Sequence, residues 1–384
     1  MSFDIDRLRR DEFPWAADGE STYLNTASTG PLPRRSVVAV ADFSERRAAP
    51  HRMTDELQFG TLDRSRELVA KLIHAQSSEI ALTTNTGFGI NIAATSLPLG
   101  KGDVVLGIEH EFPANVYPWM AASKRRAFEF RLLPVSNGIP SQEQLIAALD
   151  DRGVRAVAIS WVGFASGYRF DLAAIGAECR RRGIIFVVDA IQGLGPATID
   201  VEACAIDILA CGAQKWLLSP WGTGFVYVRR DLIRSLDPVF ASWMGVRGSD
   251  DFARLVDYDL AWRDDARRFE FITLPFQEFA GLNASLDLFF ELGPANVAAY
   301  TASLVDRVLS WATSNAVEVV TPADRAHRAG IVSLRFPDGV ARSDKLRAAG
   351  VVHSFREGAI RLAPYFFNTR DEVDRALDVL SLSR

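Results

Sequence analysis

Short apolar runs alternate with a helical pattern through the middle of the chain, and this alternation constrains the fold more than any other feature. The runs at 156–161 and 184–189 flank a segment of helical spacing at 172–182, and further runs at 206–211 and 224–228 follow. Uninterrupted apolar runs of this length are typical of parallel strands that are buried on both faces. The order strand, helix, strand therefore predicts an α/β fold, with a mostly parallel sheet and helices on both faces.

The composition is that of a globular protein with no sign of a nucleic acid or membrane partner. Of 384 residues, 48% are hydrophobic and 24% charged, and the net charge is −5. This balance does not favour binding to polyanions. No apolar run approaches membrane-spanning length, and the charged N-terminal stretch lacks an apolar signal core. Three cysteines without metal-ligand spacing predict reduced core thiols, and we expect a cytoplasmic protein without a metal site.

Lys215 lies in a turn rich in Gly, Pro and Trp, between the last two apolar runs. It is one of only five lysines, and the one with apolar and aromatic neighbours. Because burying an unpaired ammonium is costly, such an amine must be paired or lose its proton. The usual role of a neutralised lysine is a Schiff base with a carbonyl compound or with pyridoxal 5'-phosphate (PLP). A lysine that extends its ammonium to solvent is the alternative on this stretch alone.

Asp189 ends the apolar run that precedes the lysine segment. Ligands of open α/β sheets bind at the carboxyl ends of the strands. A carboxylate there can keep the pyridine nitrogen of PLP protonated, which makes the ring an electron sink. Gln192, three residues further on, is placed to reach the phenolic oxygen of the ring. A helix N-cap is the alternative role of an aspartate after a strand.

A glycine-rich turn at 85–89 follows a predicted strand and precedes a helix that we expect to open at Ile90. The free N–H groups and the dipole of a helix N-terminus favour an anion. We therefore assign the PLP phosphate to Thr86, through its hydroxyl, and to Gly87 and Phe88, through their backbone N–H groups.

The same turn has a second interpretation. Gly87-x-Gly89 resembles the start of a GxGxxG dinucleotide fingerprint, and Glu109 lies about 20 residues further on, after a strand. The third glycine position is Ile92, however. An NAD-dependent oxidoreductase is therefore an alternative, and it leaves the lysine and the aspartate without a role.

Two of these segments resemble a known family. VVDAIQ and GAQKWLLSPWGTGFVYV resemble the class V aminotransferases, which are fold-type I PLP enzymes and include cysteine desulfurases, kynureninase and isopenicillin N epimerase. The resemblance extends from YLNTASTGPLP to IRLAPYFFNTRDEVD, almost the whole chain. It implies a large PLP-binding domain at 19–285, with a sheet of the seven-stranded type. Residues 1–18 and 286–384 are then expected to form a smaller α+β domain.

The resemblance also implies roles for single residues. Arg361, in IRLAPYFFNT, is expected to hold the substrate α-carboxylate, which a planar guanidinium can bind with two hydrogen bonds. Phe112 is expected to stack on the PLP ring, with His110 as the alternative. Asn25 and Ala27, in the segment that lines the substrate side, are further candidates.

This chain departs from the family pattern at the cofactor. Gln214 and Gly212 stand where the family often has a histidine and a serine that touch the phosphate, so this contact is partly reassigned. The Gln214 amide can still donate a hydrogen bond. Phe164 stands where some members have an asparagine, so Gln192 or Ser166 must carry more of the contact with the cofactor oxygen.

The resemblance further implies a homodimer with a shared site. Thr273 aligns with a threonine that the second subunit supplies to the phosphate. Arg356, in SFREG, is a second arginine that can face the pocket.

The activity that the resemblance favours is chemistry at Cα of an amino acid, in the first place class V transamination. An epimerase or racemase and a C–S lyase that works by β-elimination are the alternatives. No cysteine follows Cys211, so the nucleophilic cysteine of the desulfurases is missing. A non-catalytic relative that binds PLP is a further alternative, and the retained lysine argues against it.

Overall fold

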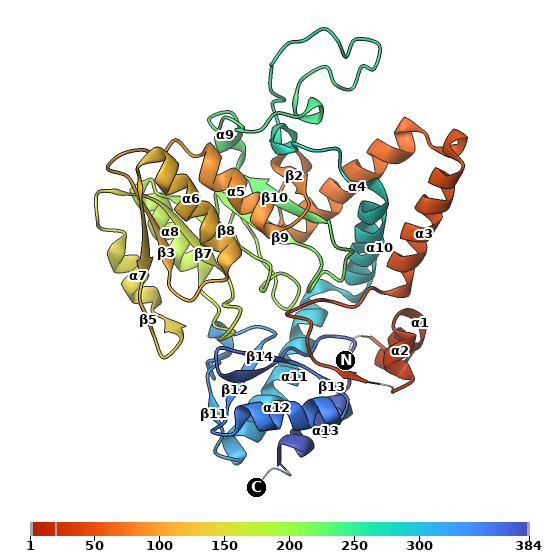
Figure 1. The fold of residues 1–384 in the computed structure, drawn as a ribbon, viewed down its shortest axis with the longest axis vertical. Helices are drawn as coiled ribbons and strands as arrows, with labels where there is room; N and C mark the ends of the chain where they lie inside the picture. Colours follow the sequence, from red (N-terminus) through yellow and green to blue (C-terminus); the bar gives the residue numbers. More distant parts are fainter. Residues whose placement is uncertain (1–2, 20, 382–384) are drawn as a thin grey trace.

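The computed structural model describes residues 3–19 and 21–381. Its centre is a seven-stranded sheet with the order β2-β10-β9-β8-β7-β3-β4 (Figure 1). Five neighbouring strands run parallel, and β10 is antiparallel to both β2 and β9. The strands are β2 (Ile80–Thr83), β3 (Val104–Ile108), β4 (Glu129–Leu133), β7 (Val154–Ser160), β8 (Ile185–Asp189), β9 (Ile208–Gly212) and β10 (Gly224–Val228).

The sequence patterns of these strands follow from their burial. Every residue of β2, β3, β9 and β10 is buried, and such strands are apolar throughout because both faces pack against other elements. The edge strand β4 is only half-buried and mixes charged with apolar residues. It therefore has no apolar run, and the sequence did not predict it.

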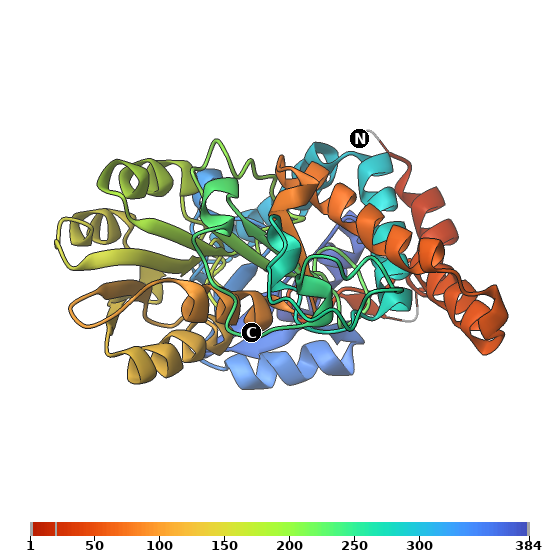
Figure 2. The ribbon, with the colours of Figure 1, turned by 90° about the horizontal axis from the view of Figure 1, so that it is seen from above.

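Helices cover both faces of this sheet, as the view from above shows (Figure 2). The predicted mostly parallel α/β fold is therefore confirmed. The helices of this part are α3 (Arg34–Ala48), α4 (Asp55–Ile73), α5 (Thr86–Ser96), α6 (Tyr117–Arg126), α7 (Gln142–Ala148), α8 (Leu172–Arg182), α9 (Arg230–Ile233) and α10 (Phe276–Leu292).

Helix α5 begins at Thr86, four residues before the expected start. Asn85 is its N-cap, and the Oδ1 atom of Asn85 accepts the Phe88 N–H at 2.9 Å. An asparagine in this position replaces one of the hydrogen bonds that the first turn of a helix lacks. The prediction missed this cap because Gly87 and Gly89 suggested a turn, whereas both lie inside the first turns of the helix.

A smaller lobe lies below the large sheet in Figure 1. Its antiparallel sheet has the order β11-β12-β15-β14. The strands are β11 (Glu318–Val319), β12 (Val332–Arg335), β14 (Ser354–Arg356) and β15 (Ala359–Leu362), and the helices are α11 (Pro294–Ser314), α12 (Gly339–Ala348) and α13 (Arg370–Ser381). Thr369 caps α13 as predicted, because its hydroxyl accepts the Glu372 N–H. The α+β character of this lobe is confirmed.

The N-terminal segment joins the smaller lobe through a short parallel pair, β1 (Thr22–Tyr23) with β13 (Val351–Val352). Helices α1 (Ile5–Glu12) and α2 (Pro14–Ala17) precede this pair, and a small hairpin of β5 (Val135–Ser136) and β6 (Ile139–Pro140) lies beside the large sheet. The predicted division at 285/286 falls inside α10 and stays a prediction.

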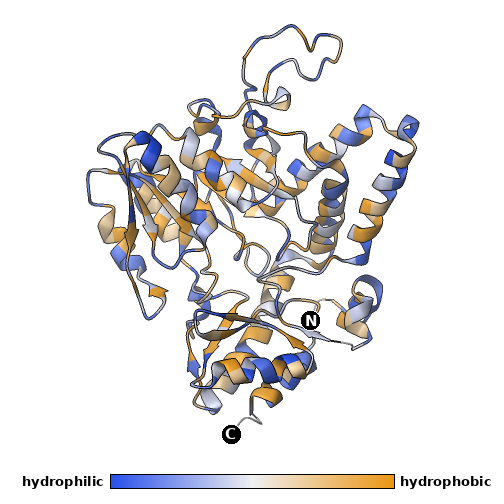
Figure 3. Ribbon diagram, in the orientation of Figure 1, coloured by the Kyte–Doolittle hydropathy of each residue, from blue (hydrophilic) through white to orange (hydrophobic). Residues whose placement is uncertain are grey.

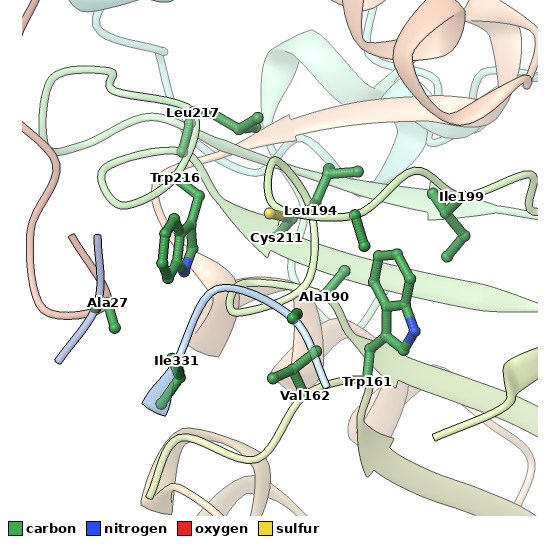
Figure 4. Packing of buried hydrophobic residues seen from close by; sticks show 14 of the residues in the cluster. Ala27, Trp161, Val162, Ala190, Leu194, Ile199, Cys211, Trp216, Leu217 and Ile331 are labelled. Carbon is green, nitrogen blue, oxygen red and sulfur yellow. The ribbon is translucent and has the colours of Figure 1, made fainter. Parts of the chain in front are cut away.

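The apolar residues concentrate in the strands and on the inner faces of the helices (Figure 3). One core cluster joins the two segments that the sequence singled out. Trp216 and Leu217, next to the lysine, belong to the same cluster as Ala190 and Leu194, which follow the aspartate (Figure 4). Packing therefore fixes both segments against each other. No helix within 3–19 and 21–381 is both long and apolar enough to span a membrane.

Candidate active site

Asp189 occupies the last position of β8, at the carboxyl edge of the parallel strands. Its side chain is 2% exposed, and its Oδ1 atom accepts the Ile191 N–H at 2.9 Å. Burial raises the pKa of this carboxyl to about 6, while the Ile191 N–H and the nearby Lys215 charge act in the opposite direction. A buried carboxylate is costly without a cationic partner, so this position favours a ligand with positive charge.

Lys215 lies close to Asp189, in the turn after β9. Burial lowers the pKa of its ammonium to about 8, Arg361 lowers it further, and the charge of Asp189 opposes the shift. The Nζ atom lies 5.5 Å from the centre of the Phe112 ring. The backbone around the lysine is tightly held, since a Cβ atom on Gly30 would meet the Lys215 carbonyl oxygen at 1.9 Å. Only glycine fits at this close approach.

Arg361 reaches the same site from β15 of the smaller lobe. It is 2% exposed, its Nη1 donates to the Phe164 carbonyl at 2.7 Å, and its Nη2 donates to the Ser28 hydroxyl at 2.8 Å. The Nε atom is buried without a hydrogen-bond partner, and no carboxylate of the described residues forms an ion pair with this guanidinium. Burial, with a smaller effect of Arg356, lowers its pKa to about 10. A buried cation without an anion is what a carboxylate-binding site requires.

Two serines and Asn25 hold Arg361 in place. The Oδ1 atom of Asn25 accepts hydrogen bonds from the hydroxyls of Ser28, at 2.9 Å, and Ser354, at 2.7 Å. Ser354 also lies 3.5 Å from Nη2 of Arg361. The sequence predicted Asn25 as a site residue but missed Ser354, because the pairing of β14 with β15 that brings it there has no local signal.

Gln192 connects the candidate residue Ala27 to the lysine segment. Its Nε2 donates to the Ala27 carbonyl at 2.9 Å, and its Oε1 accepts the Trp216 indole N–H at 2.8 Å. One N–H of the amide is left over, so a contact with the cofactor oxygen stays a prediction.

The start of α5 meets the strand end before Lys215. The Thr86 hydroxyl accepts the Gly212 N–H at 2.8 Å. The Gln214 Oε1 atom is buried without a partner and lies 2.5 Å from where a Cβ atom on Gly212 would be. Gln214 therefore fills the space that a side chain at 212 would occupy. Since an amide can turn by 180°, the same position can present an N–H to an anion.

The expectation for Phe88 requires a correction. Its N–H is bonded to Asn85, so it does not point at an anion, and its ring stacks on Phe271 with centroids 3.9 Å apart. The N–H groups of Thr86 and Gly87, which come first in α5, have no partner within the helix because of their position.

Phe112 and Thr273 differ in how they relate to the lysine. Phe112 is 45% exposed and meets Phe164 edge to face, with centroids 5.4 Å apart. Its distance from Nζ, given above, places it at the site, whereas no contact joins His110 to the lysine. Thr273 is exposed and accepts the Trp243 indole N–H at 3.3 Å.

Glu111 is a candidate site residue that the sequence analysis missed. It accepts the Ser160 N–H at 2.7 Å and also the Ser160 hydroxyl. Burial raises the pKa of its carboxyl to about 7, and the nearby Asp189 charge adds to the shift. Its position just after β3, at the same edge as Asp189, was the available signal.

Comparison with known proteins places this arrangement in a family. Residues 22–375 match the model of the class-V aminotransferases, so the chain belongs to that family of PLP-dependent enzymes. The uncharacterised aminotransferase YcbU of Bacillus subtilis (strain 168) is 29% identical, over 83% of this chain and 82% of its own. A probable cysteine desulfurase of Aeropyrum pernix is 27% identical, over 97% of this chain and 96% of its own.

A solved structure of similar fold is a variant of C-DES with glycine covalently linked to its PLP cofactor. It superposes with a TM-score of 0.88 at 22% identity and covers 97% of this chain and 98% of its own. This likeness confirms the fold-type I architecture predicted from the sequence.

Family membership also removes the reason for the NAD alternative. The glycine that suggested a dinucleotide fingerprint has a packing role, since a Cβ atom on Gly89 would lie 2.7 Å from the Ala210 Cβ in β9. Glycine is needed there so that α5 can pack closely on the sheet.

Proposed function

We propose that this chain is an amino acid aminotransferase in which Lys215 carries PLP and moves the proton at Cα of the substrate. The observation that carries the proposal is a desolvated amine, Lys215, near Arg361, which reaches the site from the smaller lobe and is buried without a carboxylate partner. When bound, PLP supplies an electron sink that stabilises negative charge at Cα.

The residues present fit this cofactor. Thr86, Gly87 and the Gln214 amide surround a position suited to the phosphate, at the N-terminus of α5. Asp189 suits the protonated ring nitrogen, which would supply the cation that its burial calls for. Phe112 offers an aromatic face beside Nζ. Gln192 has one N–H left for the ring oxygen.

Arg361 is proposed to bind the α-carboxylate of the substrate. Its Nε atom has no partner, and its Nη atoms are oriented by Phe164 and Ser28. A bound carboxylate would pair the buried charge and orient the Cα–H bond toward Lys215. Such orientation lowers the entropy cost of the proton transfer.

Lys215 is proposed as the general base and acid. Its amine has a pKa of about 8, so the free amine and its ammonium form are both present near neutral pH. The distance between the pKa and neutral pH is small enough for the same group to take and return a proton.

The charge environment of Lys215 favours transamination over racemisation. In racemisation, a second acid or base returns a proton to the opposite face of Cα. In transamination, one amine can carry out the proton transfers on a single face. The charges that shift the pKa of Lys215 are those of Asp189, Arg361, Cys211 and Arg356. Burial holds the pKa of the Cys211 thiol well above its usual range, and burial lowers the pKa of Arg361 only to about 10. Glu111, whose pKa is about 7, is bonded to Ser160, and Asp189 is assigned to the ring nitrogen, so Lys215 is the proposed base.

The test is incubation of the purified protein with PLP, single L-amino acids and a 2-oxo acid acceptor. Amino group transfer to the acceptor, lost in Lys215→Ala, is the expected result. Appearance of the D-amino acid would mean racemisation, and release of ammonia with a 2-oxo acid would mean elimination. Either of these without transfer would overturn the proposal, as would a protein that takes up no PLP.

A homodimer in the cytoplasm is also part of the proposal. The segment between α9 and α10 projects from the large lobe (Figure 1) and exposes many apolar side chains, which a second subunit could cover. These are Val239, Phe240, Trp243, Phe252, Leu255, Val256, Tyr258 and Leu260. Thr273 contacts Trp243 at the base of this segment, which supports a role across the interface. Light scattering after size exclusion tests the dimer.

A further inference from the structure

Arg356 is a second cation near the site, and it has no carboxylate partner. Its guanidinium donates only to the carbonyl of the neighbouring Phe355, at 3.2 Å, and no described acidic residue forms an ion pair with it. It is exposed and lines a cavity of about 400 Å³ beside the active-site segment that contains Phe164.

The register of β14 and β15 places Arg356 on the same face as Arg361. Ser354 pairs with Arg361, and Arg356 pairs with Ala359. Since side chains alternate along a strand, Ser354, Arg356 and Arg361 lie on one face. This face looks toward the large lobe, because Nη1 of Arg361 donates to the Phe164 carbonyl, in the segment that follows β7.

The opposite face of β14 is accounted for by packing. The Phe355 ring lies 3.2 Å from the position of a Cβ atom on Gly339, which begins α12. Figure 1 shows β14 between α12 and the large sheet. Arg356 therefore points into the space between the lobes and is not part of the packing within the smaller lobe.

The charge of Arg356 acts on both Lys215 and Arg361. It lowers the pKa of Lys215 and the pKa of Arg361, so the three cations share one region. Of the acids that line the cavity, Glu111 is bonded to Ser160, and Glu109 and Glu357 form no ion pair with Arg356. An α-carboxylate at Arg361 would therefore leave Arg356 without a carboxylate partner.

We propose that Arg356 selects substrates whose side chain carries a second carboxylate, so that the enzyme acts on short acidic amino acids. This inference rests on the proposed function. Diagonal positions on neighbouring strands are about 7–8 Å apart, which two guanidinium groups can bridge with the carboxylates of a four- or five-carbon dicarboxylate. Charge-assisted hydrogen bonds give such a contact its strength.

The first experiment compares isosteric substrates. We measure kcat and KM for aspartate against asparagine and for glutamate against glutamine, in the wild type, Arg356→Gln and Arg356→Lys. For the acidic substrates, Arg356→Gln is expected to raise KM about 10- to 100-fold, and Arg356→Lys to restore part of it. The amides should change less than threefold. Equal losses for acids and amides, or a wild type that prefers the amides, would overturn the inference.

The second experiment uses inert ligands and needs no turnover. The dissociation constants of succinate and butyrate are measured by calorimetry on the PLP-loaded protein. Succinate should bind about 10-fold more tightly than butyrate in the wild type, and Arg356→Gln should abolish the difference. Arg335→Gln is the matched control, since Arg335 lines the same cavity but is paired with Glu318 at 2.5 Å. A loss in both variants, or no preference in the wild type, would contradict the inference.

The two proposals fail in different ways. If the protein takes up no PLP, the proposed function is wrong. If it takes up PLP and transaminates neutral amino acids, with no effect of Arg356→Gln on acidic ones, only the role of Arg356 is wrong. Arg356 is exposed, so its variants are expected to fold, and circular dichroism checks this.

Discussion

Three of the buried arginines have contrasting surroundings, and the contrast separates structure from function. Arg66 forms a buried ion pair with Glu270, with side chains 6% and 1% exposed, and Arg9 does the same with Glu372, at 9% and 2%. Arg361 is equally buried but has only a carbonyl and hydroxyls around it. Because an uncompensated buried charge is costly, Arg361 is expected to be stabilised by an anionic ligand.

The paired arginines hold elements together. Glu270 binds Arg66 of α4 with both oxygens and also accepts the Leu82 N–H of β2, at 2.9 Å. Glu372 binds Arg9 of α1 and the amide of Asn368. The comparison predicts that breaking the pairs lowers stability, while changing Arg361 lowers activity.

The largest effect is expected for Glu270→Gln, which leaves Arg66 buried without its main carboxylate. The free energy of unfolding should fall by about 3–5 kcal/mol. Denaturant unfolding followed by circular dichroism measures it. The double variant Arg66→Met with Glu270→Leu serves as control and should recover part of the loss. If the single variant is as stable as the wild type, the pair does not hold the fold.

Arg361→Gln should act in the opposite way. We expect kcat/KM for the amino acid substrate to fall about 1,000-fold, since a buried carboxylate would lose its cation. Stability of the cofactor-free protein should not fall, because the variant removes an unpaired buried charge. Steady-state kinetics and thermal unfolding test the two halves. A destabilised variant with normal KM would place Arg361 with the structural arginines.

Lys215→Met extends the comparison from buried arginines to a buried amine. The pKa of Lys215 is about 8 in the folded protein, below its usual 10.5, so the unfolded chain holds the proton to higher pH. The cofactor-free variant should exceed the wild type in stability by about 3 kcal/mol below pH 8, and the gap should close as the pH rises toward 10.5. Unfolding curves across this range test it. A gap that does not change with pH would show that the lysine is not desolvated.

The smallest effect is expected at the phosphate position. Gln214→Leu should raise the dissociation constant of PLP about 5- to 10-fold, because one hydrogen bond to the phosphate is lost. Fluorescence titration with PLP measures this, and Gln214→His should retain more affinity. An unchanged constant in Gln214→Leu would mean that the amide only fills the space beside Gly212.

Much of the site could be predicted because its residues follow apolar strands. Asp189 ends the buried strand β8 and Lys215 follows shortly after β9, and parallel strands bring their carboxyl ends to one edge. Helix α5 illustrates the limit, since two glycines hid a helix start that the Asn85 side chain fixes. The contacts of Gln192 and Phe88 were also beyond sequence patterns, because they depend on which neighbour takes each N–H group.

The sequence by itself determined the fold class, the family and which polar residues stand at the ends of the buried strands. It could do so because burial on both faces and residue spacing are local properties of the chain. The tertiary structure decided which charges are paired. The family resemblance nominated Arg361, but only the packing shows that Arg66 has a carboxylate partner and that Arg361 has none. The register of β14 with β15 likewise sets Arg356 beside Arg361, since long-range pairing, and no local pattern, decides which side chains share a face.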